Sequence, residues 1–381
     1  MTRSVGPLLT VDLDALRCNW QRVQARFTGQ CVGAVVKHDA YGLGLAHVVP
    51  VLAAAGCRYF WVDTPQRGLA VRAALPAHAP HADVLVLYGL AGMSMADHAA
   101  HGLVPVLTSL EEVASVRESA RLHHTPHRVA IHLDTGLTRL GLQEPDVVAL
   151  LNHPDWLEGL HITDWVTQLS RFDAPHDPAC LRQRARFAQW TARLPAARRC
   201  VATSAGVLAE PPLHGDHARV GAALYGIDTS PDHGQQLAVV ATLTAPVLQV
   251  VAVPADTAVG YGGLFRTPRP SLIATVAAGY GDGLPMPLAQ GGQVVLHGHA
   301  APMVGAMAMG LLSVDVTDLP AGAVRPGDAA ELYGTHLNLN SVARRAGLSA
   351  AAVLVPSASR AERRCTTASV PGVCTASGVL A

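Results

Sequence analysis

The chain has 381 residues, half of them hydrophobic, and its 28 Lys and Arg residues balance its 28 Asp and Glu residues. This length exceeds one average domain and predicts two domains, each with a sizeable core. The zero formal charge argues against a nucleic-acid partner bound through its phosphates and against electrostatic attachment to acidic membranes.

Apolar strand-like segments alternate with helical segments such as 45–55 and 181–194 over the first two thirds of the chain. We expect strands at Val32–Val36, Tyr59–Val62, Val84–Tyr88, Val104–Leu107, Val129–Leu133, Leu160–Thr163, Cys200–Thr203 and Ala218–Gly221. Eight strands that alternate with helices predict an α/β fold in which a parallel sheet closes into a (β/α)8 TIM-type barrel, here over residues 8–235. Chemistry in such barrels takes place at the carboxyl ends of the strands.

The sequence pattern changes after Gly234. Short Val-rich segments separated by Pro, Gly and Asp predict a mostly β C-terminal domain over residues 236–365, with a helix at Ser341–Ala346. Residues 366–381 are rich in small side chains, and we expect them to form a loose tail.

Lys37 is the only lysine in the chain, and it stands at the end of the first expected barrel strand. An amine there can form a Schiff base with an aldehyde such as pyridoxal phosphate, although a lysine that reaches to solvent is the commoner case. Tyr41 can offer a hydroxyl to a phosphate, or can simply pack in a turn.

Two later segments also follow expected strands. Arg139, in HLDTGLTRLGL, can hold a carboxylate through two hydrogen bonds, or can be an ordinary surface arginine. The serine of TSAGV (203–207) and the glycine-containing turn of ARVGAALYGI (218–227) can together bind an anion.

Taken in chain order, these segments resemble the alanine racemase family. VVKHDAYGLG (35–44) is similar to the family pattern VVKA(D/N)AYGHG, DTGLTRLG (134–141) to DTGMxRLG, and RVGAALYG (219–226) to RPGIxLYG. In the second domain GYGDG (279–283) resembles GYADG, and AMAMGLLSVDVT (306–317) resembles xxxMDxxxVDVT. The similarity spans roughly residues 8–335, with the motifs in the family's order.

The resemblance implies an isomerase that uses pyridoxal 5'-phosphate to interconvert L- and D-alanine, the latter a peptidoglycan precursor. Lys37 would hold the cofactor and act as one acid/base, and Tyr280 would be the other. In the family the counterpart of Tyr280 comes from a second subunit, which implies a head-to-tail homodimer with shared active sites.

The resemblance also implies the binding residues. Arg219 would face the pyridine nitrogen, and Arg139 with the backbone near Met309 would hold the substrate carboxylate. The phosphate would be bound by Tyr41, Ser204, Gly221 and Ala222.

Several positions depart from the family pattern. His132 replaces a lysine whose carbamate orients the arginine, and Asp164 replaces a histidine that supports the tyrosine. Beside Tyr280 an anionic Asp164 would disfavour a phenolate, unless Asp164 pairs with Arg219. The other departures are Cys200, Leu284, Gly310 and Ala351. Two alternatives stay open: a racemase of a larger amino acid (serine, lysine or arginine), or a regulatory protein that binds pyridoxal phosphate without racemising.

A metal site and a secreted protein are not expected. The histidines are dispersed, and the seven cysteines are scattered without CxxC spacing, so neither zinc nor a disulfide framework is favoured. No apolar run reaches 18 residues and the N-terminal segment lacks a cleavage pattern, so we expect a cytoplasmic protein.

Overall fold

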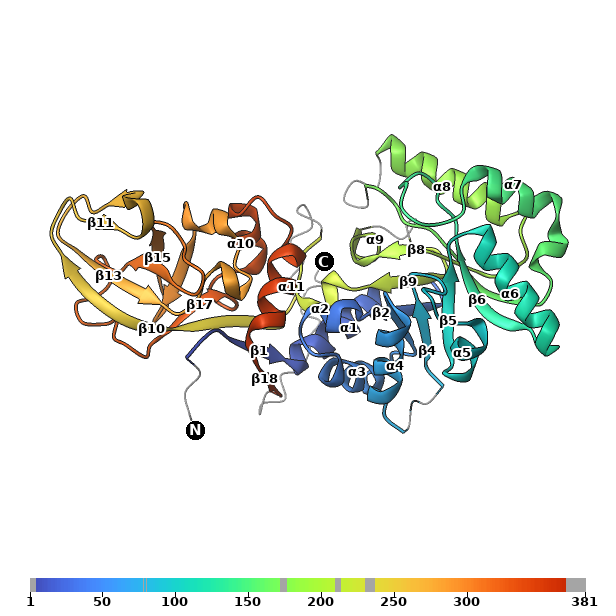
Figure 1. The fold of residues 1–381 in the computed structure, drawn as a ribbon, viewed down its shortest axis with the longest axis horizontal. Coiled ribbons are helices and arrows are strands. Elements are labelled where there is room, and N and C mark those ends of the chain that lie inside the picture. The colour runs from blue at the N-terminus through green and yellow to red at the C-terminus, as the bar shows by residue number, and fades with distance from the viewer. Residues whose placement is uncertain are drawn as a thin grey trace, which may run out of the picture.

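Two bodies lie side by side in the computed structural model, which describes residues 5–77, 79, 81–171, 177–209, 214–229 and 237–367. One body is a closed barrel wrapped by helices, and the other is built around a mostly antiparallel sheet (Figure 1).

The barrel has eight parallel strands that follow one another in chain order, and the last strand pairs with the first to close the ring. Its strands are β2 (Cys31–Val35), β3 (Tyr59–Val62), β4 (Asp83–Val86), β5 (Leu103–Leu107), β6 (His127–His132), β7 (Leu160–Val166), β8 (Arg198–Thr203) and β9 (His217–Val220). Their Val and Leu side chains are buried on both faces of the sheet, as parallel strands require. The expected (β/α)8 barrel is therefore confirmed.

Several barrel helices begin at side chains that accept hydrogen bonds from the first backbone N–H groups. The Asp12 carboxylate accepts from the N–H groups of Asp14 and Ala15 at the start of α1, and Ser109 accepts from Glu112 at the start of α6. The helices are α1 (Leu13–Arg26), α3 (Leu45–Ala54), α4 (Pro65–Ala74), α5 (Met95–Ala100), α6 (Leu110–His123), α7 (Glu144–Asn152), α8 (Pro178–Thr191) and α9 (Ser204–Ala209), with 3-10 turns η1 (Pro154–Leu157) and η3 (Ala222–Tyr225).

The second body contains an eight-stranded sheet in the order β13-β16-β15-β14-β17-β10-β1-β18. The strands are β1 (Leu8–Asp12), β10 (Ala241–Val253), β13 (Ser271–Val276), β14 (Gln293–Leu296), β15 (His299–Val304), β16 (Leu312–Asp315), β17 (Ala329–Tyr333) and β18 (Glu362–Thr366). A small hairpin of β11 (Ala258–Val259) and β12 (Phe265–Arg266), the 3-10 turns η4 (Tyr261–Gly263), η5 (Tyr280–Asp282) and η6 (Met286–Ala289), and helices α10 (Leu339–Arg345) and α11 (Ala350–Arg360) complete it. The expected mostly β character is confirmed.

The strand that begins at residue 8 lies in this second sheet, although the sequence analysis expected the barrel to start there. β1 pairs antiparallel with β10 and parallel with β18, so strands from both ends of the described chain are neighbours. α11 and β18 were not expected from the sequence pattern. Of the tail expected over 366–381, Thr366 ends β18, and residues 368–381 lie outside the described chain.

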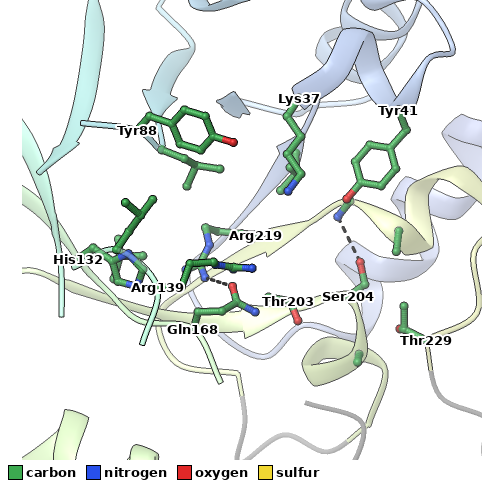
Figure 2. Close-up of a pocket in the computed structure, with 17 residues that line it drawn as sticks. Lys37, Tyr41, Tyr88, His132, Arg139, Gln168, Thr203, Ser204, Arg219 and Thr229 are labelled. Atoms are coloured by element: carbon green, nitrogen blue, oxygen red, sulfur yellow. Dashed lines mark hydrogen bonds between the residues drawn. The ribbon is translucent and has the colours of Figure 1, made fainter. Parts of the chain in front are cut away.

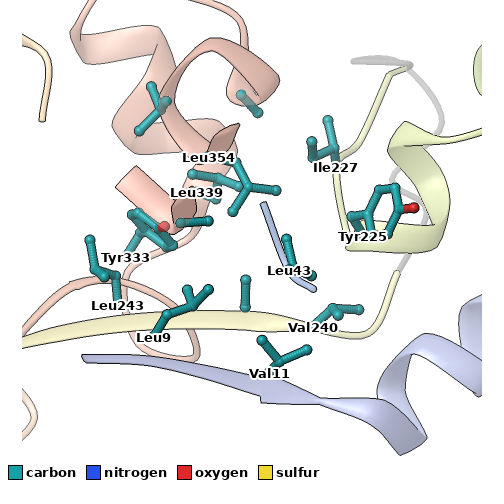
Figure 3. Close-up of a cluster of buried hydrophobic side chains, with 14 of the residues drawn as sticks. Leu9, Val11, Leu43, Tyr225, Ile227, Val240, Leu243, Tyr333, Leu339 and Leu354 are labelled. Carbon is teal, nitrogen blue, oxygen red and sulfur yellow. The ribbon is translucent and has the colours of Figure 1, made fainter. Parts of the chain in front are cut away.

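A continuous apolar core joins the two bodies. Leu9, Val11, Leu243 and Leu354 of the second body pack in one cluster with Leu43 and Tyr225 of the barrel (Figure 3). The buried Tyr225 hydroxyl donates to the carbonyl of Val35, at the end of the first barrel strand. In the described part of the chain, no helix combines the length and apolarity needed to cross a membrane.

Candidate active site

A cavity of about 620 Å³ opens at the carboxyl ends of the barrel strands (Figure 2). Residues from the ends of β2, β4, β6, β7, β8 and β9 converge on it, which is where barrel folds place their chemistry. Its polar lining residues are Lys37, Tyr41, Tyr88, His132, Arg139, Gln168, Thr203, Ser204, Arg219 and Thr229. Every expected barrel-domain site residue, including Gly221 and Ala222, lines this one cavity.

The turn that carries Lys37 and Tyr41 winds left-handed. In α2 (Lys37–Tyr41), the four consecutive residues His38 to Tyr41 have φ between 51° and 59°. Such a conformation costs roughly 1–2 kcal/mol for each residue other than glycine, so the surrounding structure must hold it in place. The result is that Lys37 and Tyr41 both face the cavity (Figure 2).

Lys37 is poised as a nucleophilic amine. Burial lowers its pKa, and the positive charges of Arg139 and Arg219 lower it further, while Asp63 opposes them. No hydrogen-bond partner for the Lys37 amine occurs among the described residues. A lysine with a depressed pKa and a free amine is suited to attack a carbonyl carbon.

One end of the cavity is built for an anion such as a phosphate. The Ser204 hydroxyl accepts from the N–H groups of Gly221 (3.2 Å) and Ala223 (3.1 Å), which ties the starts of α9 and η3 together. The buried Thr229 hydroxyl has no partner among the residues described, and it faces the same space as Tyr41. The Ser204 and Thr229 hydroxyls, together with Tyr41 at the same end, fit the phosphate of pyridoxal phosphate.

Arg219 is buried and held with one donor left over. Its two terminal nitrogens donate to the carbonyls of Cys200 and Thr167, the Cys200 sulfur (3.2 Å) and the Gln168 side-chain oxygen (2.9 Å). Burial raises the pKa of Cys200 to about 12, so this thiol is neutral. The remaining N–H, on Nε, has no acceptor in the described chain, and it is available to a ring nitrogen in the cavity.

His132 and Arg139 occupy the other end of the cavity. Burial lowers the pKa of His132 to about 4, with help from the charge of Arg219, so its ring is neutral near pH 7. Arg139 is exposed, and its guanidinium has neither an ion pair nor a hydrogen bond within the described ranges. Its neighbours Thr138 and Leu140 both have positive φ, which turns Arg139 toward the cavity. A free guanidinium there can receive a carboxylate.

The Asp164 carboxylate is neutralised inside the barrel. It accepts from Arg198 at 2.8 and 3.1 Å and from His217 Nδ1 at 2.8 Å. Burial opposes its ionisation, but these hydrogen bonds outweigh burial and lower the pKa of Asp164. Asp164 is not among the described residues that line the cavity. Its negative charge is balanced by Arg198.

The two expected residues of the second body do not reach the cavity of their own chain. Tyr280, in η5, and Met309, in a neighbouring loop, are 42% and 66% exposed, and all described lining residues belong to the barrel. Backbone hydrogen bonds from Tyr280 to Ala308 (3.2 Å) and from Gly281 to Met309 (2.7 Å) hold the two segments together. Leu284, one of the departures from the family pattern, is buried in the apolar core of this chain.

Sequence reasoning missed four polar lining residues: Tyr88, Gln168, Thr203 and Thr229. Each lies at or after the end of a barrel strand, so position alone was the available signal. Gln168 lies beside Arg219 and Thr229 lies at the anion end (Figure 2).

Comparison with known proteins yields one family. The chain matches the alanine racemase N-terminal domain over residues 11–229 and the alanine racemase C-terminal domain over residues 240–365. The alanine racemase of Acidiphilium cryptum is 41% identical over 341 residues, 90% of this chain and 93% of that protein. The alanine racemase of Rhodospirillum rubrum is 36% identical over 358 residues, 94% of this chain and 95% of that protein.

Solved structures agree with the sequence matches. The alanine racemase from Bartonella henselae with covalently bound pyridoxal phosphate superimposes with a TM-score of 0.90 at 30% identity, covering 95% of this chain and all of that one. The biosynthetic alanine racemase from Pseudomonas aeruginosa gives a TM-score of 0.84 at 29% identity, with 95% of this chain covered.

Proposed function

Because this chain belongs to the alanine racemase family, we propose that its barrel cavity is the active site, with Lys37 and Tyr280 as the two acid/base groups. The protein is a pyridoxal-phosphate-dependent alanine racemase, an isomerase that interconverts L- and D-alanine. The observation that carries the site assignment is the convergence of the only lysine, a hydroxyl-lined anion end and a free guanidinium in one cavity.

Each side chain has a distinct binding task. Lys37 would hold the cofactor through its amine, and Tyr41, Ser204, Thr229, Gly221 and Ala222 would bind its phosphate. Pyridoxal phosphate, when bound, draws electrons from the α-carbon of the amino acid and makes its α-proton acidic.

The two arginines recognise the two remaining polar groups. Arg219 would face the pyridine nitrogen and would keep its own proton, because an arginine stays protonated in proteins. A ring nitrogen that receives no proton is a weaker electron sink, which favours return of the α-proton over side reactions. Arg139 and the backbone near Met309 bind the substrate carboxylate.

Racemisation requires a proton to leave one face of the α-carbon and another to arrive on the opposite face. In the proposed site, the Lys37 amine serves one face and the Tyr280 phenol serves the other. Each group takes the proton in one direction of the reaction and gives it in the reverse direction.

We further propose a head-to-tail homodimer in which Tyr280 and Met309 enter the cavity of the partner subunit. The support is that both side chains are exposed on the second body and are absent from their own cavity. Exposed apolar side chains on the same body are consistent with a covered surface: Tyr261, Leu264, Met286 and Leu311. We also propose that the enzyme works in the cytoplasm and supplies D-alanine for peptidoglycan.

The decisive experiment supplies the purified protein with pyridoxal phosphate and, separately, the L- and D-forms of alanine, serine, lysine and arginine. Chiral chromatography should show alanine converted fastest in both directions. Lys37→Ala should lose the visible absorption of the bound cofactor together with activity. Tyr280→Phe should keep the colour but slow α-proton exchange in one enantiomer more than in the other.

The proposal fails if the wild-type protein takes up no cofactor. It also fails if Tyr280→Phe affects both enantiomers equally and slightly. Faster conversion of serine, lysine or arginine would instead assign the enzyme to a larger substrate.

A further inference from the structure

Residues from the last helix and the last strand of the described chain contact the turn that carries Lys37. Arg363, on β18, donates from Nη2 to the carbonyl of Gly42 (2.6 Å) and pairs with the Asp39 carboxylate (3.1 Å). The other oxygen of Asp39 accepts from the backbone N–H of Leu45 at 2.7 Å. Arg363 therefore contacts the left-handed turn at the Asp39 side chain and at the backbone of Gly42, which follows the turn.

Arg363 and α11 pack closely against the glycines that follow the turn. Arg363 Nη1 lies 2.5 Å from the position that a Cβ on Gly44 would occupy, and Gly44 itself has a φ of +97°. α11 closes the turn from another side, because a Cβ on Gly42 would lie 2.9 Å from Ala358 Cβ. Glycines at 42 and 44 thus let the second body approach the turn at van der Waals distance.

The barrel holds the same turn from its other side. His38 Nε2 lies 3.5 Å from the buried Asp63 carboxylate, which in turn binds Arg67 at 2.6 Å. Successive residues of the left-handed turn, His38 and Asp39, are thus held by different bodies of the molecule. A turn of four positive-φ residues needs contacts of this kind to persist.

We propose that Arg363 is a positioning residue for the cofactor site: it fixes the turn from Lys37 to Tyr41 so that the lysine amine and the tyrosine hydroxyl reach one pyridoxal phosphate together. This inference rests on the proposed function, and it deepens it by making the second body part of the same subunit's own cofactor site. Arg363 touches neither the cavity nor the reacting atoms.

The test compares Arg363→Met, which keeps an apolar stem, with Arg363→Lys, which keeps one charged donor. Arg364→Met is the matched control, because Arg364 is the adjacent arginine on β18, is exposed, and makes no hydrogen bond or ion pair with the turn among the described residues. The first readout is the affinity of the cofactor-free protein for pyridoxal phosphate, followed by its visible absorption. Loss of two charge-assisted hydrogen bonds should weaken binding about tenfold or more in Arg363→Met. Arg363→Lys should recover much of it, and Arg364→Met should match the wild type.

The second readout is hydrogen exchange of residues 38–45 in the cofactor-free protein, which does not depend on the proposed function. Arg363→Met should exchange about tenfold or more faster there, at unchanged exchange of the barrel strands. The inference is overturned if Arg363→Met protects this turn as the wild type does, or if Arg364→Met loosens it equally. Wild-type protein that binds no pyridoxal phosphate would sink the proposed function, while exchange would still decide the role of Arg363.

Discussion

At the scale of single residues, the cavity gathers basic side chains and, in the described chain, no carboxylate lines it. The pKa of Lys37 is lowered, the pKa of His132 is lowered to about 4, and Arg139 and Arg219 supply much of the positive field. A cavity of this kind favours anionic groups, which suits a ligand with a phosphate and a substrate with a carboxylate.

His132 gives the protein a pH-dependent stability. Its folded pKa of about 4 lies below the unfolded value near ~6.5, so between these values only the unfolded state binds the proton. This contribution to the free energy of unfolding is present above about pH 6.5 and is lost as the pH falls toward 4. His132→Asn should reduce the slope of the free energy of unfolding against pH by the equivalent of up to one bound proton, because asparagine takes up no proton in this range. Urea unfolding at several pH values between 7 and 4 measures this slope. Parallel curves for the variant and the wild type would contradict this account.

At the scale of elements, the sequence predicted the strands that a local residue pattern specifies. The eight barrel strands were expected within a few residues of their observed bounds, because Val-rich runs alternating with helices are a repeated local signal. Residues 8–12 were expected in the barrel domain, but they form β1 of the second sheet. The sequence of a five-residue strand does not reveal which strands pair with it, and here these are β10 and β18. The left-handed turn at His38–Tyr41 has no local signal either, because non-glycine residues rarely adopt positive φ.

The same limit applies to the site. Motif order brought the barrel residues together correctly, yet it could not show that Asp164 is paired with Arg198, or that Leu284 is core. Those outcomes depend on contacts between segments far apart in the chain. The partners of Tyr280 depend on a second chain, which no local pattern describes.

Gly221 lies close to Tyr41 at the anion end of the cavity, and this contact leads to a prediction. A Cβ added there would lie 2.5 Å from the Tyr41 hydroxyl oxygen and 3.2 Å from Val35 Cβ, too close for either to stay in place. Gly221→Ala should therefore displace Tyr41 and weaken binding of pyridoxal phosphate about tenfold or more. A titration of the cofactor-free variant checks this. Gly6→Ala, where an added Cβ would meet no atom of the described chain within 4 Å, serves as the control, and unchanged affinity in Gly221→Ala would refute the argument.

At the scale of the whole molecule, the proposed function divides the active site between the two bodies. The barrel supplies the cavity, and the exposed Tyr280 and Met309 of the second body have no place in their own chain's cavity. Under the proposed dimer, each site therefore takes its lysine from one subunit and its tyrosine from the other.

Mixing two inactive variants tests this division. A hybrid of Lys37→Ala with Tyr280→Phe would contain one site with both groups intact and one site with neither. Random pairing should restore about one quarter of the wild-type activity after the two proteins are unfolded and refolded together. Each variant refolded alone should remain inactive. Absence of recovery in hybrids verified by mass spectrometry would show that Lys37 and Tyr280 act within one chain, or not together.

The pairing of β1 with β10 and β18 sets an order of events during synthesis. Residues 8–12 leave the ribosome first, but their neighbours at 241–253 and 362–366 follow much later, at roughly 5–20 residues per second. Lys37 likewise emerges early, whereas Arg363 emerges after nearly all of the chain that is described. We therefore expect nascent chains that stop before β18 to bind the aldehyde more weakly, so that cofactor loading reports that synthesis has passed Thr366.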